Sequence, residues 1–310
     1  MNKKYRVGVD LGGTNIAVGV IDENYNIIGR GKLKTNVPRP AEEIMADIVK
    51  AVKMAVLDAG ISLDEVESIG IGTPGNVNKE KGVIEYANNL YFNQVPAVEL
   101  ISKLVDAKVY LENDANCAAL GEAIAGVGKG RKLFIAVTLG TGVGGGVILG
   151  GKILTGTKGA AGEIGHMTVE YDEEETCNCG TKGCLEQYAS ATGIVRLAKK
   201  QMVETSSLAK IDNLTAKDVF DEAKAGDAYA LQIVDRFARY LGVALGNVAQ
   251  IIDPEAFVIG GGVARAGSII TESIEKYYND SVMFALRGKQ FNLAELGNDA
   301  GIYGAVRMVL

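Results

Sequence analysis

Residues 7–20 read VGVDLGGTNIAVGV, and residues 135–148 read IAVTLGTGVGGGVI. The second stretch imitates the first at an offset of 128 residues, so that Asp10 aligns with Thr138. Each stretch is an apolar run, a glycine-rich turn and a second apolar run, which is typical of two buried strands. We therefore predict a duplicated fold with two facing lobes and a cleft between them. Two unrelated glycine hairpins would give a similar pattern.

Strand patterns alternate with helical patterns along the rest of the chain, which indicates the α/β class. Besides the two strands within residues 135–148, we expect strands at 5–10, 16–21, 26–35, 66–71, 108–111, 152–155 and 256–259. We expect helices at 41–59, 98–104, 115–124, 193–204, 216–225, 227–250, 268–277 and 299–310. The last helix carries small residues that permit close packing.

The composition is that of an ordinary globular protein, with 47% hydrophobic and 23% charged residues among 310. The formal net charge of −6 offers no basic field, so we expect no nonspecific nucleic-acid binding. No apolar run approaches the ~20 residues of a membrane helix, and no targeting segment is visible. We expect a cytoplasmic protein without membrane association.

A short segment holds the only histidine of the chain and three of its four cysteines, namely His166, Cys177, Cys179 and Cys184. Three thiolates and one imidazole form a complete tetrahedral zinc set, which leaves no position for an activated water. We therefore predict a structural zinc ion. A disulfide would leave one of the three thiols unpaired and needs an oxidising compartment. Buried thiols that act as small hydrophobes are the other alternative, and we favour it for Cys117.

Two carboxylates flank the predicted metal site. Glu163 lies three residues before His166, and Glu186 lies two residues after Cys184. A rigid metal site that orients two carboxylates suits the binding of a polyhydroxy ligand. We interpret the Glu173–Glu175 run, just before the first of these cysteines, as a solvated loop.

Glycine turns follow three predicted strands, at Gly12–Gly13, Gly140–Gly142 and Gly260–Gly262. Backbone amides in such turns approach phosphate oxygens closely and form an anion-binding nest. Three of them together favour a nucleotide site, although each alone is explained equally by a hairpin. Neither GxxxxGK[ST] nor a GxGxxG motif that opens a helix after the first strand is present.

Two aspartates stand at positions where chemistry is expected. Asp10 ends the first strand and is suited to hold Mg²⁺ through water, or alternatively to accept hydrogen bonds from turn amides. Asp114 lies at a strand-to-helix junction, where it would be either the helix N-cap or a general base.

Six motifs together resemble one known family, the ROK family of bacterial sugar kinases, open reading frames and repressors. They are residues 10–15 (DLGGTN), 70–75 (GIGTPG), 112–116 (ENDAN), 139–144 (LGTGVG), 163–166 (EIGH) and 177–186 (CNCGTKGCLE). The resemblance runs almost end to end and is greatest to ROK glucokinases. It implies two actin-like, ribonuclease H-like lobes with ATP and a sugar in the cleft. We expect a small lobe at 1–114 plus 299–310 and a larger one at 115–298 that carries the zinc motif.

The resemblance also implies an ATP-dependent glucokinase in which Asp114 is the general base for the sugar 6-hydroxyl. Substrate binding is implied for Gly75, Asn89, Asn113, Asp114, Glu163, His166 and Glu186. Binding of ATP and Mg²⁺ is implied for Asp10, Gly12, Gly13, Thr14, Asn15, Thr138, Gly140, Thr141, Gly142, Gly261 and Gly262. Zinc would be held by His166, Cys177, Cys179 and Cys184, and a homodimer is usual in the family.

Other members of the family define the alternatives. The chain would otherwise phosphorylate another hexose or an N-acylhexosamine, such as fructose, mannose or N-acetylmannosamine, and polyphosphate is another phosphoryl donor. A sugar-responsive repressor is the remaining alternative. Such repressors carry a DNA-binding segment before the first strand, whereas only four residues precede Tyr5 here. We therefore expect no DNA binding.

Overall fold

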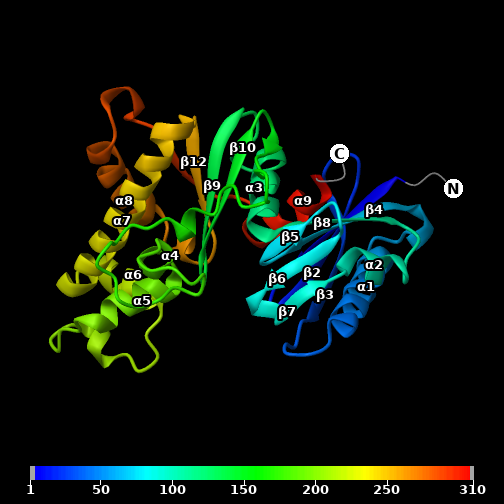
Figure 1. The fold of residues 1–310 in the computed structure, drawn as a ribbon, viewed down its shortest axis with the longest axis horizontal. Coiled ribbons are helices and arrows are strands. Elements are labelled where there is room, and N and C mark those ends of the chain that lie inside the picture. The colour runs from blue at the N-terminus through cyan, green and yellow to red at the C-terminus, as the bar shows by residue number, and fades with distance from the viewer. Residues whose placement is uncertain (1–3, 308–310) are drawn as a thin grey trace. The chain divides into compact units, whose positions relative to one another are not determined.

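The structure of the protein is a computed structural model that describes residues 4–307 (Figure 1). The chain forms two compact units. The first consists of residues up to 131, 146–161 and those from 295 onward, and the second of 132–145 and 162–294. The division expected from the sequence put residues 115–131 and 146–161 in the second lobe. The predicted boundaries of the two functional lobes, 1–114 plus 299–310 and 115–298, stay a prediction.

The first sheet has the strand order β3-β2-β1-β4-β8. Its strands are β1 (Tyr5–Leu11), β2 (Asn15–Ile21), β3 (Ile27–Lys34), β4 (Val66–Thr73) and β8 (Lys108–Asn113). β2 is antiparallel to both β1 and β3, whereas β4 is parallel to β1 and β8 is parallel to β4. Helix α1 (Ala41–Asp58) buries the predicted apolar face, including Ile44, Ile48 and Val52, and ends one residue before the expected position.

The second sheet repeats this order as β11-β10-β9-β12-β13. Its strands are β9 (Leu133–Leu139), β10 (Val143–Leu149), β11 (Lys152–Ile153), β12 (Ala256–Gly260) and β13 (Gln290–Leu293). Adding 128 to the bounds of β1 gives 133–139, and adding 128 to those of β2 gives 143–149, which are the bounds of β9 and β10. The repeated topology confirms the predicted duplication.

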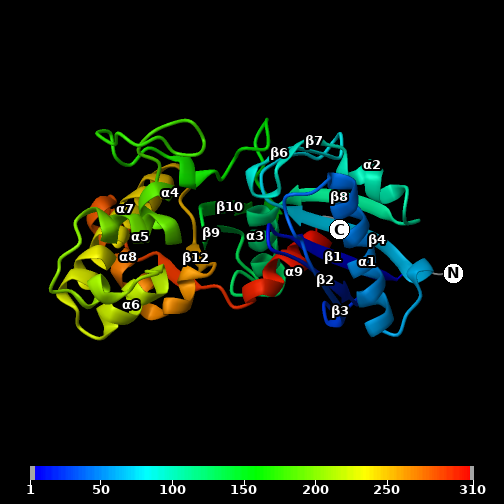
Figure 2. The same ribbon diagram turned by 90° about the horizontal axis from the view of Figure 1, so that it is seen from below.

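The second unit is otherwise mainly helical. It contains α4 (Glu186–Ala189), α5 (Ala191–Lys200), α6 (Ala216–Lys224), α7 (Ala228–Ile252) and α8 (Ser268–Ser281). α7 and α8 lie side by side (Figure 2), and α7 buries Phe237, Leu241 and Leu245. None of the described helices is both long and apolar enough to cross a membrane.

A small sheet in the first unit was missed by the sequence analysis. It consists of β5 (Asn76–Asn78), β6 (Val83–Ala87) and β7 (Phe92–Val95) in that order, with a short 3₁₀ turn at Asn88–Leu90. These strands are only three to five residues long, and β5 and β7 contain Asn or Gln, so their apolar period is weak. A one-turn α2 (Ala97–Ser102) follows the sheet. The sheet is important here because it carries Asn89.

The last helix, α9 (Ala300–Arg307), packs beside α3 (Asp114–Ile124) and against β1 and β4 of the first unit. Ile302 and Val306 are buried with Ile21 of β2. The expected helix extended to 310, but 308–310 lie outside the described residues. Gly304, one of the predicted small residues, permits the contact with α3, because a Cβ there would lie 1.7 Å from the carbonyl oxygen of Cys117. Gly70 of β4 permits the contact with the sheet, because a Cβ there would lie 1.9 Å from the carbonyl oxygen of Ala305.

This close approach predicts that Gly70→Ala destabilises the protein by about 2 kcal/mol or more, because the added methyl group forces α9 away from β4. The urea unfolding midpoint measures the effect. Gly262→Ala is the control, because no atom lies within 4 Å of its added carbon and its φ is −62°. Equal midpoints for the two variants would contradict the tight contact.

Candidate active site

Asn113, not Asp114, caps helix α3. The side-chain oxygen of Asn113 accepts hydrogen bonds from the backbone N–H groups of Ala115 (2.9 Å) and Asn116 (3.2 Å). Its amide nitrogen donates to the carbonyl oxygen of Gly75 at 3.1 Å. Asp114 is the first helical residue, and one of its oxygens accepts from the N–H of Ala115 at 2.8 Å. The alternative in which Asp114 is the cap is therefore wrong.

Asp10 and Asp114 form a like-charged pair in the first unit. Burial raises the pKa of Asp10 to about 6, and the nearby negative charge of Asp114 adds to this effect. Burial also raises the pKa of Asp114, although the hydrogen bonds from the backbone of α3 partly offset it. No turn amide among the described residues donates to Asp10, so the turn-acceptor alternative has no support. A pair of partly desolvated carboxylates is the donor set that a hard divalent cation prefers.

The first glycine turn borders a cavity of about 480 Å³ within the first unit. Asp10, Gly12, Gly13, Thr14 and Asn15 line it together with Arg30 and Lys32. Arg30 forms a two-pronged ion pair with Asp299, at 2.7 and 2.9 Å. A Cβ on Gly13 would lie 3.0 Å from the carbonyl oxygen of Asn89. The structure thus brings the predicted nucleotide residues of the first unit together beside a predicted sugar residue.

The second glycine turn, between β9 and β10, is tied to Glu186. A carboxylate oxygen of Glu186 accepts from the N–H of Val143 at 3.1 Å, and a Cβ on Gly142 would lie only 2.2 Å from it. The carbonyl oxygens of Gly140 and Thr141 accept from the Ala191 N–H and the Thr192 hydroxyl, both at 2.8 Å. Glu186 and the predicted phosphate turn are therefore neighbours.

The third glycine turn follows β12. Gly261 and Gly262 are exposed, and a Cβ on Gly261 would lie 2.4 Å from the carbonyl oxygen of Leu139. Thr138 pairs with Gly260 in the parallel register of β9 and β12. The second unit therefore holds Thr138, Gly140, Thr141 and Gly142 next to Gly261.

His166, Cys177, Cys179 and Cys184 meet in one cluster, whose donor atoms all lie within 4.8 Å of one another. Cys179 Sγ is 3.5 Å from Cys184 Sγ, and Cys177 Sγ is 4.0 Å from His166 Nδ1. Four donors on a zinc ion would be separated by roughly 3.5–3.8 Å, so the cluster fits zinc. Gly180 and Gly183 both have positive φ, as a tight loop requires. His166 Nε2 lies 4.0 Å from a carboxylate oxygen of Glu163.

Comparison with known proteins agrees with this arrangement. Residues 6–310 match the model of the ROK family. The chain belongs to the ROK family. It is 40% identical to a glucokinase of Halalkalibacterium halodurans, over 98% of this chain and 94% of that protein. It is 37% identical to a glucokinase of Thermotoga maritima, over 100% of this chain and 98% of that protein.

A solved structure of a ROK family glucokinase from Streptomyces griseus, in complex with glucose and AMPPNP, has a TM-score of 0.83 to this chain. The two are 36% identical, and the likeness covers 98% of each chain. ROK sugar kinases of this kind have two actin-like α/β lobes, so the predicted fold class is confirmed.

One interaction in this ROK chain was not predicted. Glu173 is buried, and its carboxylate is bound by the Tyr188 hydroxyl and by Arg196 at 2.5 Å. Burial alone would raise the pKa of Glu173, but the hydrogen bonds from Tyr188 and Arg196 lower it to about 2. Arg196 also binds Glu175 at 2.8 Å. The interpretation of this run as a fully solvated loop is wrong for Glu173, whose partners come from α4 and α5.

The predicted site residues divide between the units. The first unit contains Asp10, Gly12, Gly13, Thr14, Asn15, Gly75, Asn89, Asn113 and Asp114. The second unit contains Thr138, Gly140, Thr141, Gly142, Glu163, His166, Glu186, Gly261, Gly262 and the three cysteines. In the first unit, Gly13 lies against Asn89, and Asn113 donates to Gly75; in the second, Gly142 lies against Glu186. The binding roles that the resemblance implied for these residues stay predictions.

The raised pKa of Asp10 predicts a pH-dependent effect of Asp10→Asn on the ligand-free protein. Because the folded pKa of about 6 exceeds the unfolded value of 3.8, ionisation in the fold costs stability. This cost is absent below pH ~3.8, develops between pH ~3.8 and ~6, and is complete above that range. Asp10→Asn should therefore stabilise the protein by roughly 1–3 kcal/mol at pH 7.5 and by almost nothing at pH 4.

Urea unfolding at the two pH values measures this difference. Asp64→Asn, on an exposed aspartate of the same unit, is the control and should show no such pH dependence. If Asp10→Asn stabilised the protein equally at both pH values, the result would contradict the raised pKa of Asp10.

Proposed function

We propose that the protein catalyses ATP-dependent phosphorylation of glucose at the 6-hydroxyl. The observation that carries the proposal is the position of Asp114 at the start of α3, near Asp10, which borders the cavity at the first glycine turn. Asp114 is largely buried, and it is not the N-cap of the helix, because Asn113 has that role. The likeness over nearly the whole chain to named glucokinases supports the substrate. The expectations of a homodimer, of a cytoplasmic location and of no nucleic-acid binding stay predictions.

Asp114 would accept the proton of the sugar 6-hydroxyl while that oxygen attacks the γ-phosphorus of ATP. The new bond joins O6 to the γ-phosphorus, and the bond from the γ-phosphorus to the β,γ-bridging oxygen breaks, so that ADP leaves. Positioning and charge neutralisation supply most of the rate in such reactions. A raised pKa brings the carboxylate closer to the operating pH, where a general base is most effective.

Backbone amides of the turns after β1 and β9 would bind phosphate oxygens, because clustered N–H groups form an anion nest. Mg²⁺, when bound with ATP, would neutralise negative charge on the phosphates. Asp10 is the residue of the first unit suited to hold that ion, through water. The side chain of Lys32 lines the same cavity and is a cation available to phosphate.

Sugar hydroxyl groups would be bound by a separate set of side chains. In the first unit, Asn113 offers one amide hydrogen, because its oxygen caps α3 and its other hydrogen binds Gly75. In the second unit, Glu163 and Glu186 would accept from hydroxyl groups, and His166 would use Nε2 while Nδ1 faces the metal cluster. Gly75 and Asn89 would line the pocket. Hydrogen-bond partners that the bound sugar covers would discriminate against sugars that lack a hydroxyl.

Asp114→Asn tests the general base. The variant keeps an oxygen that accepts from the Ala115 N–H but cannot take up the proton. We expect kcat to fall ~10²–10⁴-fold, with the Kd for glucose changed only a few-fold. A coupled ADP-release assay with ATP over a panel of hexoses and N-acylhexosamines gives kcat and the substrate. Direct detection of the sugar phosphate does the same with polyphosphate as the donor.

Glu80→Gln, on an exposed carboxylate of the same unit, is the control and should keep wild-type kcat. A wild-type kcat for Asp114→Asn would overturn the assignment of the base. The absence of turnover on every sugar in the panel would overturn the proposed function.

Cys184→Ala tests the predicted structural zinc. Cys184 is fully buried, and its loss would leave three donors, so we expect loss of bound metal together with weaker glucose binding through His166. Elemental analysis and glucose titration measure the two effects. Cys117→Ala removes a buried thiol far in sequence from the cluster and should keep the metal. Full activity of freshly purified wild-type protein without any bound metal would refute the zinc prediction.

A further inference from the structure

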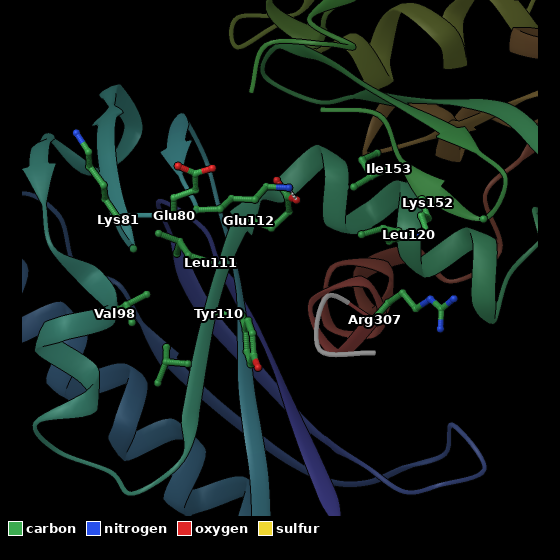
Figure 3. Close-up of a pocket in the computed structure, with 14 residues that line it drawn as sticks. Glu80, Lys81, Val98, Tyr110, Leu111, Glu112, Leu120, Lys152, Ile153 and Arg307 are labelled. Atoms are coloured by element: carbon green, nitrogen blue, oxygen red, sulfur yellow. Dashed lines mark ion pairs between the residues drawn. The ribbon is translucent and has the colours of Figure 1, made fainter. Parts of the chain in front are cut away.

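A second carboxylate, which is buried, lies two residues before the proposed base in the chain. Glu112, in strand β8, precedes Asn113 and Asp114, and its side chain is only 2% exposed. One of its oxygens accepts from the backbone N–H of Asn113 at 2.9 Å and from the side-chain amide of Asn116 at 3.0 Å. The other oxygen forms an ion pair with the ammonium group of Lys79 (Figure 3).

Both hydrogen bonds of Glu112 end on the segment that carries Asp114. Asn113 caps α3 and also binds the carbonyl oxygen of Gly75, so its orientation sets the start of the helix. Asn116 is buried in the first turn of α3. The carboxylate therefore fixes the residues on both sides of Asp114, although no direct hydrogen bond joins Glu112 to Asp114 among the described residues.

The position of Glu112 also places it near other negative charge. Asp10 is the register partner of Gly72, and Gly72 is the register partner of Glu112, so the two carboxylates lie in one row across three strands. The pKa of the Cys117 thiol is raised by burial and by the charges of Glu112, Asp114 and Asp10, and is lowered by Lys79. The positive charge of Lys79 thus partly offsets the negative charge of these carboxylates.

Stability alone does not explain a buried carboxylate at this position. Taking the Glu112 carboxylate out of water costs about as much as its attraction to Lys79 returns, so a well-packed apolar side chain would serve stability equally well. The Lys79 side chain is 38% exposed and lies in the wall of a cavity of about 570 Å³. The adjacent Glu80 and Lys81 line the same cavity, but neither forms an ion pair with a described residue, and Lys81 points away from the pair (Figure 3).

We propose that Glu112, charge-balanced by Lys79 and bonded to Asn116, is a positioning residue that sets the orientation of Asp114 for proton transfer. The proposal rests on the proposed function. Glu112 does not touch the substrate; it holds the β8–α3 turn in the one conformation that presents the Asp114 carboxylate. A misplacement of the base by a fraction of an ångström is enough to slow a proton transfer substantially.

The first test is Glu112→Gln, which keeps the size of the side chain but weakens both hydrogen bonds. We expect kcat to fall roughly 10- to 100-fold, with the Kd for glucose and the KM for ATP within about threefold of wild type. Glu80→Gln and Lys81→Met are matched controls from the same turn and cavity, and both should keep wild-type kcat. Wild-type kcat in Glu112→Gln, or a loss that appears only in KM, would overturn the proposal.

A second test uses the ion pair itself. Lys79→Met alone leaves a buried, uncompensated carboxylate. Its urea unfolding midpoint should therefore fall below the midpoints of Glu112→Gln and of the double variant that carries both Lys79→Met and Glu112→Gln. In the double variant the midpoint should recover, whereas kcat should stay as low as in Glu112→Gln. Recovery of kcat along with stability would show that Glu112 has only a structural role and would overturn the proposal.

Backbone hydrogen exchange at residues 113–117 gives a readout that does not depend on turnover. Exchange there should be at least several-fold faster in Glu112→Gln than in the wild type and in both controls, while exchange in α1 stays unchanged. If Glu112→Gln does not fold, Asn116→Ala removes one of the two bonds and should show a smaller effect of the same kind. If wild-type protein phosphorylates no sugar, the proposed function fails, and the exchange result still decides whether Glu112 fixes the turn.

Discussion

Three carboxylates, Asp10, Glu112 and Asp114, are held where strands of the first sheet end. Burial raises the pKa of Asp10 and of Asp114, and Glu112 is also buried. Lys79 balances Glu112, and backbone N–H groups of α3 partly offset the cost for Asp114. Asp10 keeps a pKa of about 6 because no comparable partner is present among the described residues. This unbalanced negative charge is what makes the site suited to a cation, which would supply the missing compensation and would also attract the phosphates of a ligand.

The second unit uses a different device to hold polar groups in place. His166 and three cysteines, which could hold a metal ion, meet in one cluster. The Glu173–Arg196–Tyr188 interaction anchors the segment that leads into the cysteine loop. Glu186 follows the last cysteine and is fixed by the N–H of Val143. The cysteine loop therefore contacts His166 on one side and leads into Glu186 on the other, so the cluster is joined to the glycine turn after β9.

The repeated sheet order gives the two halves of the chain a similar framework. Each half brings a glycine turn after its first strand, at the same place in the same strand order. The halves then differ in what surrounds that turn. In the first, α9 returns from the end of the chain to back β1 and β4, and glycines such as Gly70 permit its backbone to approach. In the second, α4 and α5 hold the turn through Glu186, Ala191 and Thr192.

Local patterns in the sequence determined the strands, the 128-residue repeat, the glycine turns and the metal-binding set, because each depends on residue type and short spacing. The tertiary structure alone decided that Asn113 caps α3, that Glu173 is buried, that residues 76–95 form a small sheet, and that Lys79 reaches Glu112. Each of these depends on a partner distant in the chain, or on a choice between two adjacent residues of similar propensity. The spacing of residues in the sequence does not reveal such partners or choices. A glutamate on the surface and a glutamate buried against a distant lysine look the same in the local sequence.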